Sequence, residues 1–170
     1  MGNRTYSRRG CLAGVGALLL AAPLPAKTPK IACPTDRVTI TGGFGTAAFN
    51  VDVAADAASR AQGLMHVEKM ALSRGMLFVY QRPQRMSFWM RNTLIELDML
   101  FLDGFGVIRH IHHRAQPHDE TPISGGPALL TGVLEINGGL ARRLGLGVGD
   151  VLRHPAFVSR DDPWVCAAQD

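Results

Sequence analysis

Cysteine, aromatic residues and long apolar runs are all scarce in this sequence of 170 residues. The 3 cysteines form no C-x-x-C pair, which excludes a dithiol redox site of that kind. No apolar run reaches the roughly 20 residues that a spanning helix needs, so a protein with several membrane helices is excluded. P-loop, dinucleotide-binding and G-x-S-x-G motifs are also missing. The sequence therefore favours a non-catalytic protein without a cofactor.

Acidic residues are missing before Asp36, whereas Arg4, Arg8 and Arg9 fall within the first ten residues. The formal net charge is +4, from 18 basic and 14 acidic residues. Without those three arginines, 15 basic residues face 14 acidic ones. A chain whose basic and acidic residues are nearly equal in number lacks the dense basic face that binding to a phosphate backbone requires. We therefore expect no binding to nucleic acid.

The first 26 residues have the layout of a secretory signal peptide. A basic head precedes the apolar segment Cys11–Ala22, and small residues follow up to Ala26, where we expect cleavage. The mature protein is therefore expected in the periplasm or outside the cell. Ser7–Leu12 partly resembles a twin-arginine motif, so the general secretory and twin-arginine routes both stay open. The alternative is an uncleaved leader, which would be the protein's sole contact with a membrane.

Two cysteines, Cys33 and Cys166, lie near the two ends of the mature chain. Chain termini are often close in space, and an oxidising compartment would allow these thiols to pair. The alternative is two free thiols in terminal tails, and the sequence leaves both possibilities open.

The mature chain has the pattern of many short strands separated by glycine and proline turns. Residues 27–48 are expected to form an N-terminal extension with the first strand, 49–154 a single domain and 155–170 a tail. Asp56 is placed to cap a short helix that ends near Leu64. The expected strands are Val38–Thr41, Ala47–Val53, Met76–Tyr80, Met86–Met90, Glu96–Leu102, Val107–His112, Leu130–Ile136 and Val151–Arg153, with a helix at Leu140–Leu144 and an exposed loop over Ala115–Ala128. This pattern predicts a mainly β (α+β) protein, a small barrel or rolled sheet of about seven strands with two short helices.

Several motifs in a fixed order resemble those of a known family. They are Arg60–Met65, Gly75–Phe78, Ser87–Thr93, Leu97–Phe101, Val133–Gly139, Leu144–Leu146 and Gly149–Asp150. Together they are similar to the domain-of-unknown-function 192 family, over about Phe49 to Arg153. The resemblance implies a compact, mainly β fold and frequent export. It implies no reaction and no catalytic residues.

Asp98 is the most informative polar residue, because it lies inside an apolar stretch where a carboxylate is costly unless it is paired. It is either a structural carboxylate, bound to backbone amides or to an arginine such as Arg60, or a carboxylate in a binding cleft. Glu135 and Asn137 share one face of a strand, which is either solvated or part of a site. We expect six residues to converge at one mouth of the barrel as candidates for ligand binding: Arg60, Trp89, Asn92, Asp98, Glu135 and Asn137.

Three histidines form a second candidate site. His110 and His112 point the same way on an expected strand, and His118 from the following loop could complete a zinc or copper site. The alternative is solvated histidines at a sheet edge.

Three hypotheses follow from these candidates. The preferred one is an exported, monomeric binding or accessory protein of the cell envelope, whose partner is a small molecule or an envelope protein. The alternatives are a periplasmic metal-binding protein and an enzyme on a small or saccharide-like substrate, with Asp98 and Glu135 as an acid–base pair.

Overall fold

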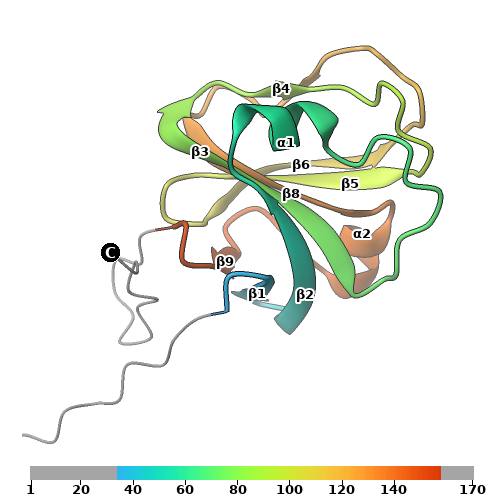
Figure 1. The fold of residues 1–170 in the computed structure, drawn as a ribbon. Coiled ribbons are helices and arrows are strands. Elements are labelled where there is room, and N and C mark those ends of the chain that lie inside the picture. The colour runs from blue at the N-terminus through green and yellow to red at the C-terminus, as the bar shows by residue number, and fades with distance from the viewer. Residues whose placement is uncertain (1–33, 158–170) are drawn as a thin grey trace, which may run out of the picture.

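The computed structural model describes residues 34–157, which form nine strands and two short helices (Figure 1). These elements are β1 (Arg37–Gly42), β2 (Gly45–Ala54), α1 (Ala57–Gln62), β3 (Arg74–Gln84), β4 (Ser87–Phe88), β5 (Leu97–Leu102), β6 (Ile108–Ala115), β7 (Ile123–Ser124), β8 (Leu130–Asn137), α2 (Leu140–Leu144) and β9 (Val151–Arg153). The mainly β class and the two short helices are thereby confirmed.

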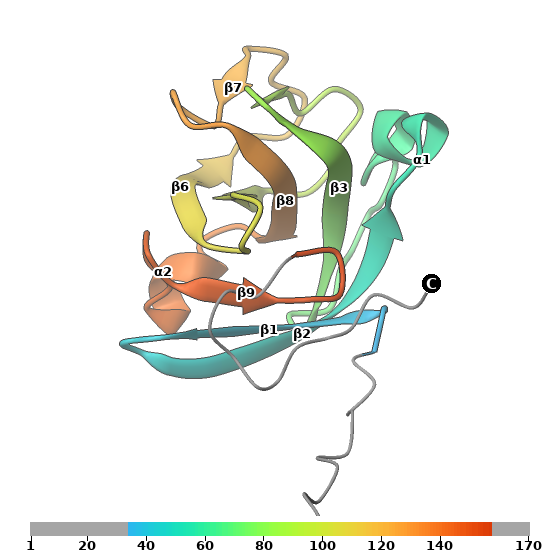
Figure 2. The same cartoon turned by 90° about the vertical axis from the view of Figure 1, so that its left-hand side faces the viewer.

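Seven strands form one curled sheet in the order β6-β5-β8-β3-β2-β1-β9. β2 and β3 run parallel, with α1 in the connection between them, and the other strand pairs of the sheet are antiparallel. The Ile108 amide donates to the Asp150 carbonyl at 2.9 Å, and the Leu152 amide donates to the Gly106 carbonyl at 2.8 Å. These bonds connect the segment before β6 to the segment around β9, the two edge strands, at one end only. The sheet is therefore curled into a half-barrel (Figure 2).

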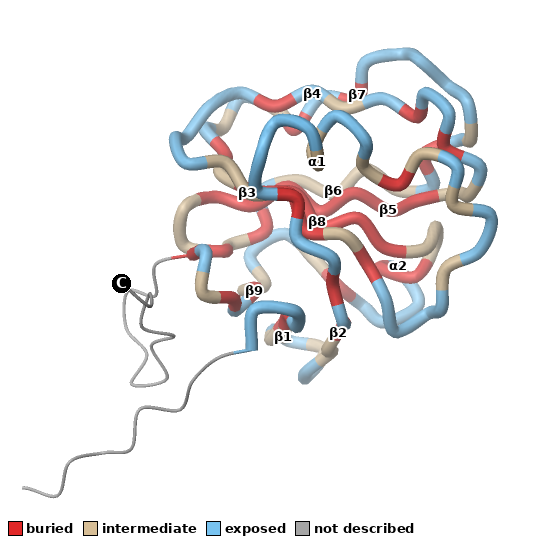
Figure 3. Tube along the Cα trace, in the orientation of Figure 1, coloured by how far each residue is buried: buried red, intermediate tan, exposed pale blue. Residues whose placement is uncertain are grey.

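Both faces of the curled sheet bury apolar side chains, because successive residues of a strand point to opposite faces. One core contains Leu100 and Leu134 and is closed by β1, β2, α2 and β9. The second core contains Met99 and Val133 and lies between the sheet and the small sheet of β4 and β7. Figure 3 shows the result, since β5 and β8 are almost continuously buried along the middle of the molecule.

Two local expectations need correction. The strand expected over Met86–Met90 is reduced to the two residues of β4, because Met86 and Met90 turn into the second core instead of extending a ladder. The segment Ala115–Ala128, which we expected to be an exposed loop, contains β7, and its residues Ala115 and Ile123 are buried. This segment is the cover of the second core.

The ends of the described chain also belong to the folded unit. β1 and all of β2 are strands of the main sheet, and Phe157, which falls in the expected tail, packs into the first core. Among residues 34–157, no helix is long and apolar enough to cross a membrane. Cys33 and Cys166, like the expected signal peptide, lie outside the described residues.

Candidate functional site

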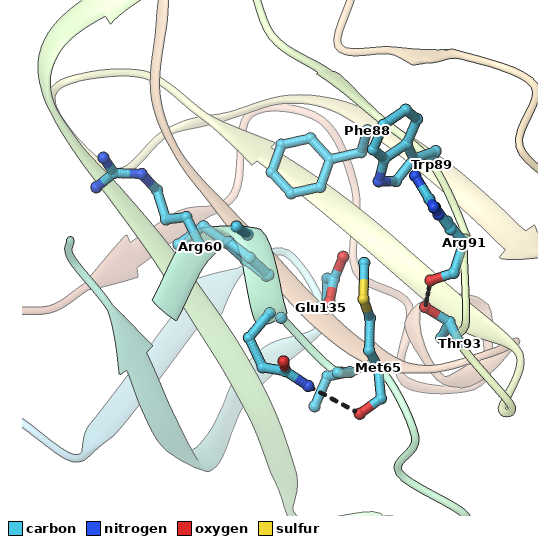
Figure 4. Close-up of a pocket in the computed structure, with 12 residues that line it drawn as sticks. Arg60, Met65, Phe88, Trp89, Arg91, Thr93 and Glu135 are labelled. Atoms are coloured by element: carbon cyan, nitrogen blue, oxygen red, sulfur yellow. Dashed lines mark hydrogen bonds between the residues drawn. The ribbon is translucent and has the colours of Figure 1, made fainter. Parts of the chain in front are cut away.

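A small pocket opens between α1 and the loop that follows β4, on the side of the sheet that carries the second core (Figure 4). Its cavity volume is about 50 Å³, which is room for a substituent rather than for a whole metabolite. We call it the Glu135 pocket, after the residue between its walls. Its lining residues are Arg60, Ala61, Gln62, Gly63, Leu64, Met65, Phe78, Phe88, Trp89, Arg91, Thr93 and Glu135.

Glu135 reaches the pocket from the centre of the sheet. In the strand register it lies opposite Met76 of β3 and Met99 of β5, and its residue is 4% exposed. Its carboxyl group makes no hydrogen bond or ion pair within residues 34–157. Burial away from water raises the pKa of Glu135 to about 8, so the carboxyl group is mostly protonated at neutral pH. The solvated face that we considered for this residue is therefore wrong, because α1 and the β4 segment cover it.

Arg60 borders the pocket without pairing with Glu135. Asp56 caps α1 by accepting hydrogen bonds from the amides of Ala58 and Ser59, each at 2.9 Å, and this fixes the helix that carries Arg60. Figure 4 shows the guanidinium of Arg60 pointing away from Glu135. Its Nη1 donates to the carbonyls of two residues, Ala55 at 2.6 Å and Val79 at 3.0 Å.

Aromatic and hydroxyl side chains form the opposite wall. Phe88 contacts Phe78 edge to face, with ring centroids 5.1 Å apart, and this anchors the wall to the second core. Trp89 remains 51% exposed at the mouth, and the guanidinium of Arg91 lies 6.0 Å from its ring centroid. The Thr93 hydroxyl donates to the Arg91 carbonyl at 3.3 Å, which holds the end of the loop.

Three of the six expected ligand-binding residues, Arg60, Trp89 and Glu135, line the same pocket. Asn92 is not a lining residue, but its Nδ2 lies 3.9 Å from the sulfur of Met65, which is one. Asn137 donates through Nδ2 to the Ala71 carbonyl at 3.1 Å, outside the pocket lining.

Asp98 lies elsewhere and holds three backbone amides. Its side chain is fully buried and accepts from the amides of Arg114 at 2.8 Å, Gly139 at 2.9 Å and Ala141 at 2.8 Å. It therefore ties the irregular end of β6 to the start of α2. Of our two interpretations, this geometry matches the structural carboxylate, with amides and not Arg60 as partners.

The expected acid–base pair of Asp98 and Glu135 is wrong. Asp98 lies opposite Ile136 in the register between β5 and β8, whereas Glu135 lies opposite Met99. Paired residues share a face of the sheet and neighbouring residues do not. The two carboxyl groups therefore point to opposite faces, and one substrate cannot lie between them.

The histidines do not assemble a metal site within the part of the chain that is described. No group of three His, Cys, Asp or Glu side chains there could hold an ion. His110 and His112 do share a face of β6, opposite Phe101 and Met99, and the ring centroid of His110 lies 5.7 Å from that of Phe101. His118 is exposed in the loop. The expected three-ligand arrangement is thus contradicted.

Sequence reasoning missed Met65, Arg91 and Thr93 as lining residues. All three belong to motifs that carry the family resemblance, Arg60–Met65 and Ser87–Thr93, so the ordered motifs did contain the signal. The alternation of polar and apolar residues along one strand could not reveal that these two segments meet above β8.

The fold and site together define a class: a small half-barrel with one buried, unpaired carboxyl group under a pocket. The particular family follows from sequence comparison, since residues 38–154 match DUF192, whose description is "Uncharacterized ACR". The chain belongs to this family, and the resemblance seen in the motifs is confirmed. No curated protein matches the chain.

Two crystal structures are similar along most of the chain. One, from Sinorhizobium meliloti 1021, is provisionally named a transcription regulator; it is 37% identical, with a TM-score of 0.69, over 76% of this chain and 100% of that one. The other, from Novosphingobium aromaticivorans DSM 12444, is a protein of unknown function; it is 38% identical, with a TM-score of 0.67, over 75% of this chain and 94% of that one.

Proposed function

We propose that this protein is an exported binding protein of the cell envelope that takes a polar group of a small ligand into the Glu135 pocket. The observation that carries the proposal is Glu135, a residue that is 4% exposed and whose carboxyl group has no hydrogen-bond or ion-pair partner among residues 34–157. Burying a polar group without a hydrogen bond costs free energy, and natural sequences accept such costs mainly where function requires them.

A ligand would recover part of this cost. A protonated carboxyl group offers one O–H donor and an acceptor oxygen, and the aromatic side chains of Phe78, Phe88 and Trp89 line the pocket with it. A few convergent polar groups in a mostly apolar hollow are typical of small-molecule sites. Binding would then give this carboxyl group the hydrogen-bond partner that it lacks among residues 34–157.

The lining chemistry supports binding rather than catalysis. The ionisable residues that line the pocket are Glu135, Arg60 and Arg91, so the described part of the chain provides no second carboxyl, imidazole or thiol group there. General acid–base work usually needs a partner poised to move the other proton, and Asp98 faces the opposite side of the sheet.

A fragment screen tests the binding site. We expect small hydroxyl- and amide-containing fragments to shift the amide NMR signals of Gly63, Met65 and Trp89. Ala61→Trp plugs the mouth from the exposed surface of α1, so these shifts should be lost. Ala71→Trp, an equally exposed change outside the lining, should leave them unchanged. Binding that survives Ala61→Trp would place the ligand elsewhere and contradict the proposal.

Export is tested separately on the full chain. We expect to find the mature protein as a monomer in the periplasm or the medium. Its intact mass should equal that of a chain that begins at Lys27. Replacing Leu18 and Leu19 in the apolar segment with lysine should retain the precursor in the cytoplasm, whereas the same changes at the exposed Leu72 and Leu129 should not. A wild-type chain found intact in the cytoplasm would overturn the envelope assignment.

A further inference from the structure

We propose that the ligand is an acidic saccharide, whose sugar ring lies in a groove beside α1 while one of its substituents enters the Glu135 pocket. This inference rests on the proposed function and names its ligand class. It starts from the second, larger hollow of the surface.

The second hollow, which we call the Tyr80 groove, adjoins the Glu135 pocket at Arg60, the residue that lines both. Its cavity volume is about 480 Å³, so it has room for the ring that the 50 Å³ pocket cannot hold. Its lining residues are Ala55, Asp56, Arg60, Tyr80, Gln81, Arg82 and Gln84.

The charges along this path favour an anion. Arg82 is exposed in the groove and makes no ion pair within residues 34–157, and Arg91 lies across the pocket from Arg60 (Figure 4). The one carboxylate of the groove, Asp56, is already occupied by the amides of Ala58 and Ser59 and by the Ser59 hydroxyl. Guanidinium groups bind carboxylates through paired N–H donors, which suits a sugar acid.

The remaining groups favour a sugar over a simple acid. Gln81 and Gln84 bring amide groups that can both donate to and accept from hydroxyls. The exposed ring of Trp89, at the mouth of the Glu135 pocket, offers a flat apolar surface to the substituent that enters there. Glu135, protonated at neutral pH, offers a donor and an acceptor to a hydroxyl or hydroxymethyl substituent. An ammonium group is disfavoured by the arginines at both sides of the pocket.

Calorimetric titration of the mature protein at low ionic strength tests the inference. The probes are the α-1,4-linked galacturonate trimer, its fully methyl-esterified form, which is the neutral matched control, and tricarballylate, a tricarboxylate without a ring. We expect the acidic trimer to bind about tenfold more tightly than its ester, and tricarballylate to bind weakest. Arg82→Gln should lower the ratio of trimer affinity to ester affinity. Arg142→Gln on α2, which removes the same charge outside both hollows, should not change it.

The experiments distinguish failure of the acidic-saccharide inference from failure of the proposed function. Equal affinity for trimer and ester, or tricarballylate binding as tightly as the trimer, overturns the acidic-saccharide inference. So does the absence of trimer binding while fragments still bind in a manner that Ala61→Trp abolishes, a result that leaves the pocket proposal intact. If no fragment and no trimer binds, both proposals fail.

Discussion

Asp98→Ala is expected to lower the free energy of unfolding by about 3–5 kcal/mol, the largest loss of stability of any single substitution proposed for this protein. The side chain is fully buried and accepts from three backbone amides, those of Arg114, Gly139 and Ala141. Removing it leaves these donors without a partner and leaves a cavity. For a domain of this size, the melting temperature should fall by roughly 10–15 °C.

The matched control for this prediction is Asp52→Ala. Asp52 pairs with Arg74 at 2.7 Å, but both side chains are largely exposed, so the loss should stay below about 1 kcal/mol. Asp98→Asn keeps the size of the side chain but replaces one acceptor oxygen with a donor, and should lose most of the same stability. Urea unfolding of the three variants measures the effect. A loss below about 1 kcal/mol for Asp98→Ala would show that the amides find other partners.

Glu135→Gln is expected to stabilise the protein at alkaline pH, by on the order of 3–5 kcal/mol at pH 8, and to change little at pH 4. The pKa of Glu135 is about 8 in the folded protein and has an ordinary value of 4.5 in the unfolded chain. Between these values the folded state binds more protons than the unfolded state. Stability that is fully present below pH 4.5 is therefore lost as the pH rises towards 8, and glutamine removes this dependence.

Urea unfolding at a series of pH values measures this effect as a slope. The wild type should lose up to about 1.4 kcal/mol for each pH unit between about 5 and 8, relative to Glu135→Gln. Glu120→Gln, which removes an exposed carboxyl group in the loop before β7, serves as the control and should keep the wild-type slope. Parallel curves for wild type and Glu135→Gln would mean that Glu135 has a partner in solution and is not the unpaired group on which the binding proposal depends.

Both predictions concern carboxyl groups on adjacent buried strands, but the two groups differ in their hydrogen-bond partners. Both carboxylate oxygens of Asp98 accept hydrogen bonds from backbone amides, so Asp98 stabilises the junction of β6 and α2. Glu135 has no hydrogen-bond or ion-pair partner among residues 34–157, and its raised pKa lowers the stability of the fold as the pH rises from about 4.5 towards 8. This contrast separates the structural carboxylate Asp98 from the carboxyl group that we propose binds a ligand more clearly than burial does, since both are buried.

Local patterns in the sequence predicted the regular elements well where short-range chemistry decides them. The capping aspartate before α1, the glycine turn between β1 and β2 and the glycine after α2 all lie at the expected residues. The exception is instructive: Met86–Met90 has the composition of a strand, but its methionines pack into the second core, and only Ser87–Phe88 pairs. Packing over the sheet outweighed the local preference there.

The sequence by itself determined the mainly β class, the family and the candidates Arg60, Trp89 and Glu135, because strand periodicity, turn residues and ordered motifs are local properties of the chain. Only the tertiary structure decided how the candidates divide. The register of β8 against β5 sends Asp98 and Glu135 to opposite faces, and the crossing of α1 and the β4 segment encloses one of them. A shift of one residue in a strand exchanges its faces, and pairing between distant strands sets that register.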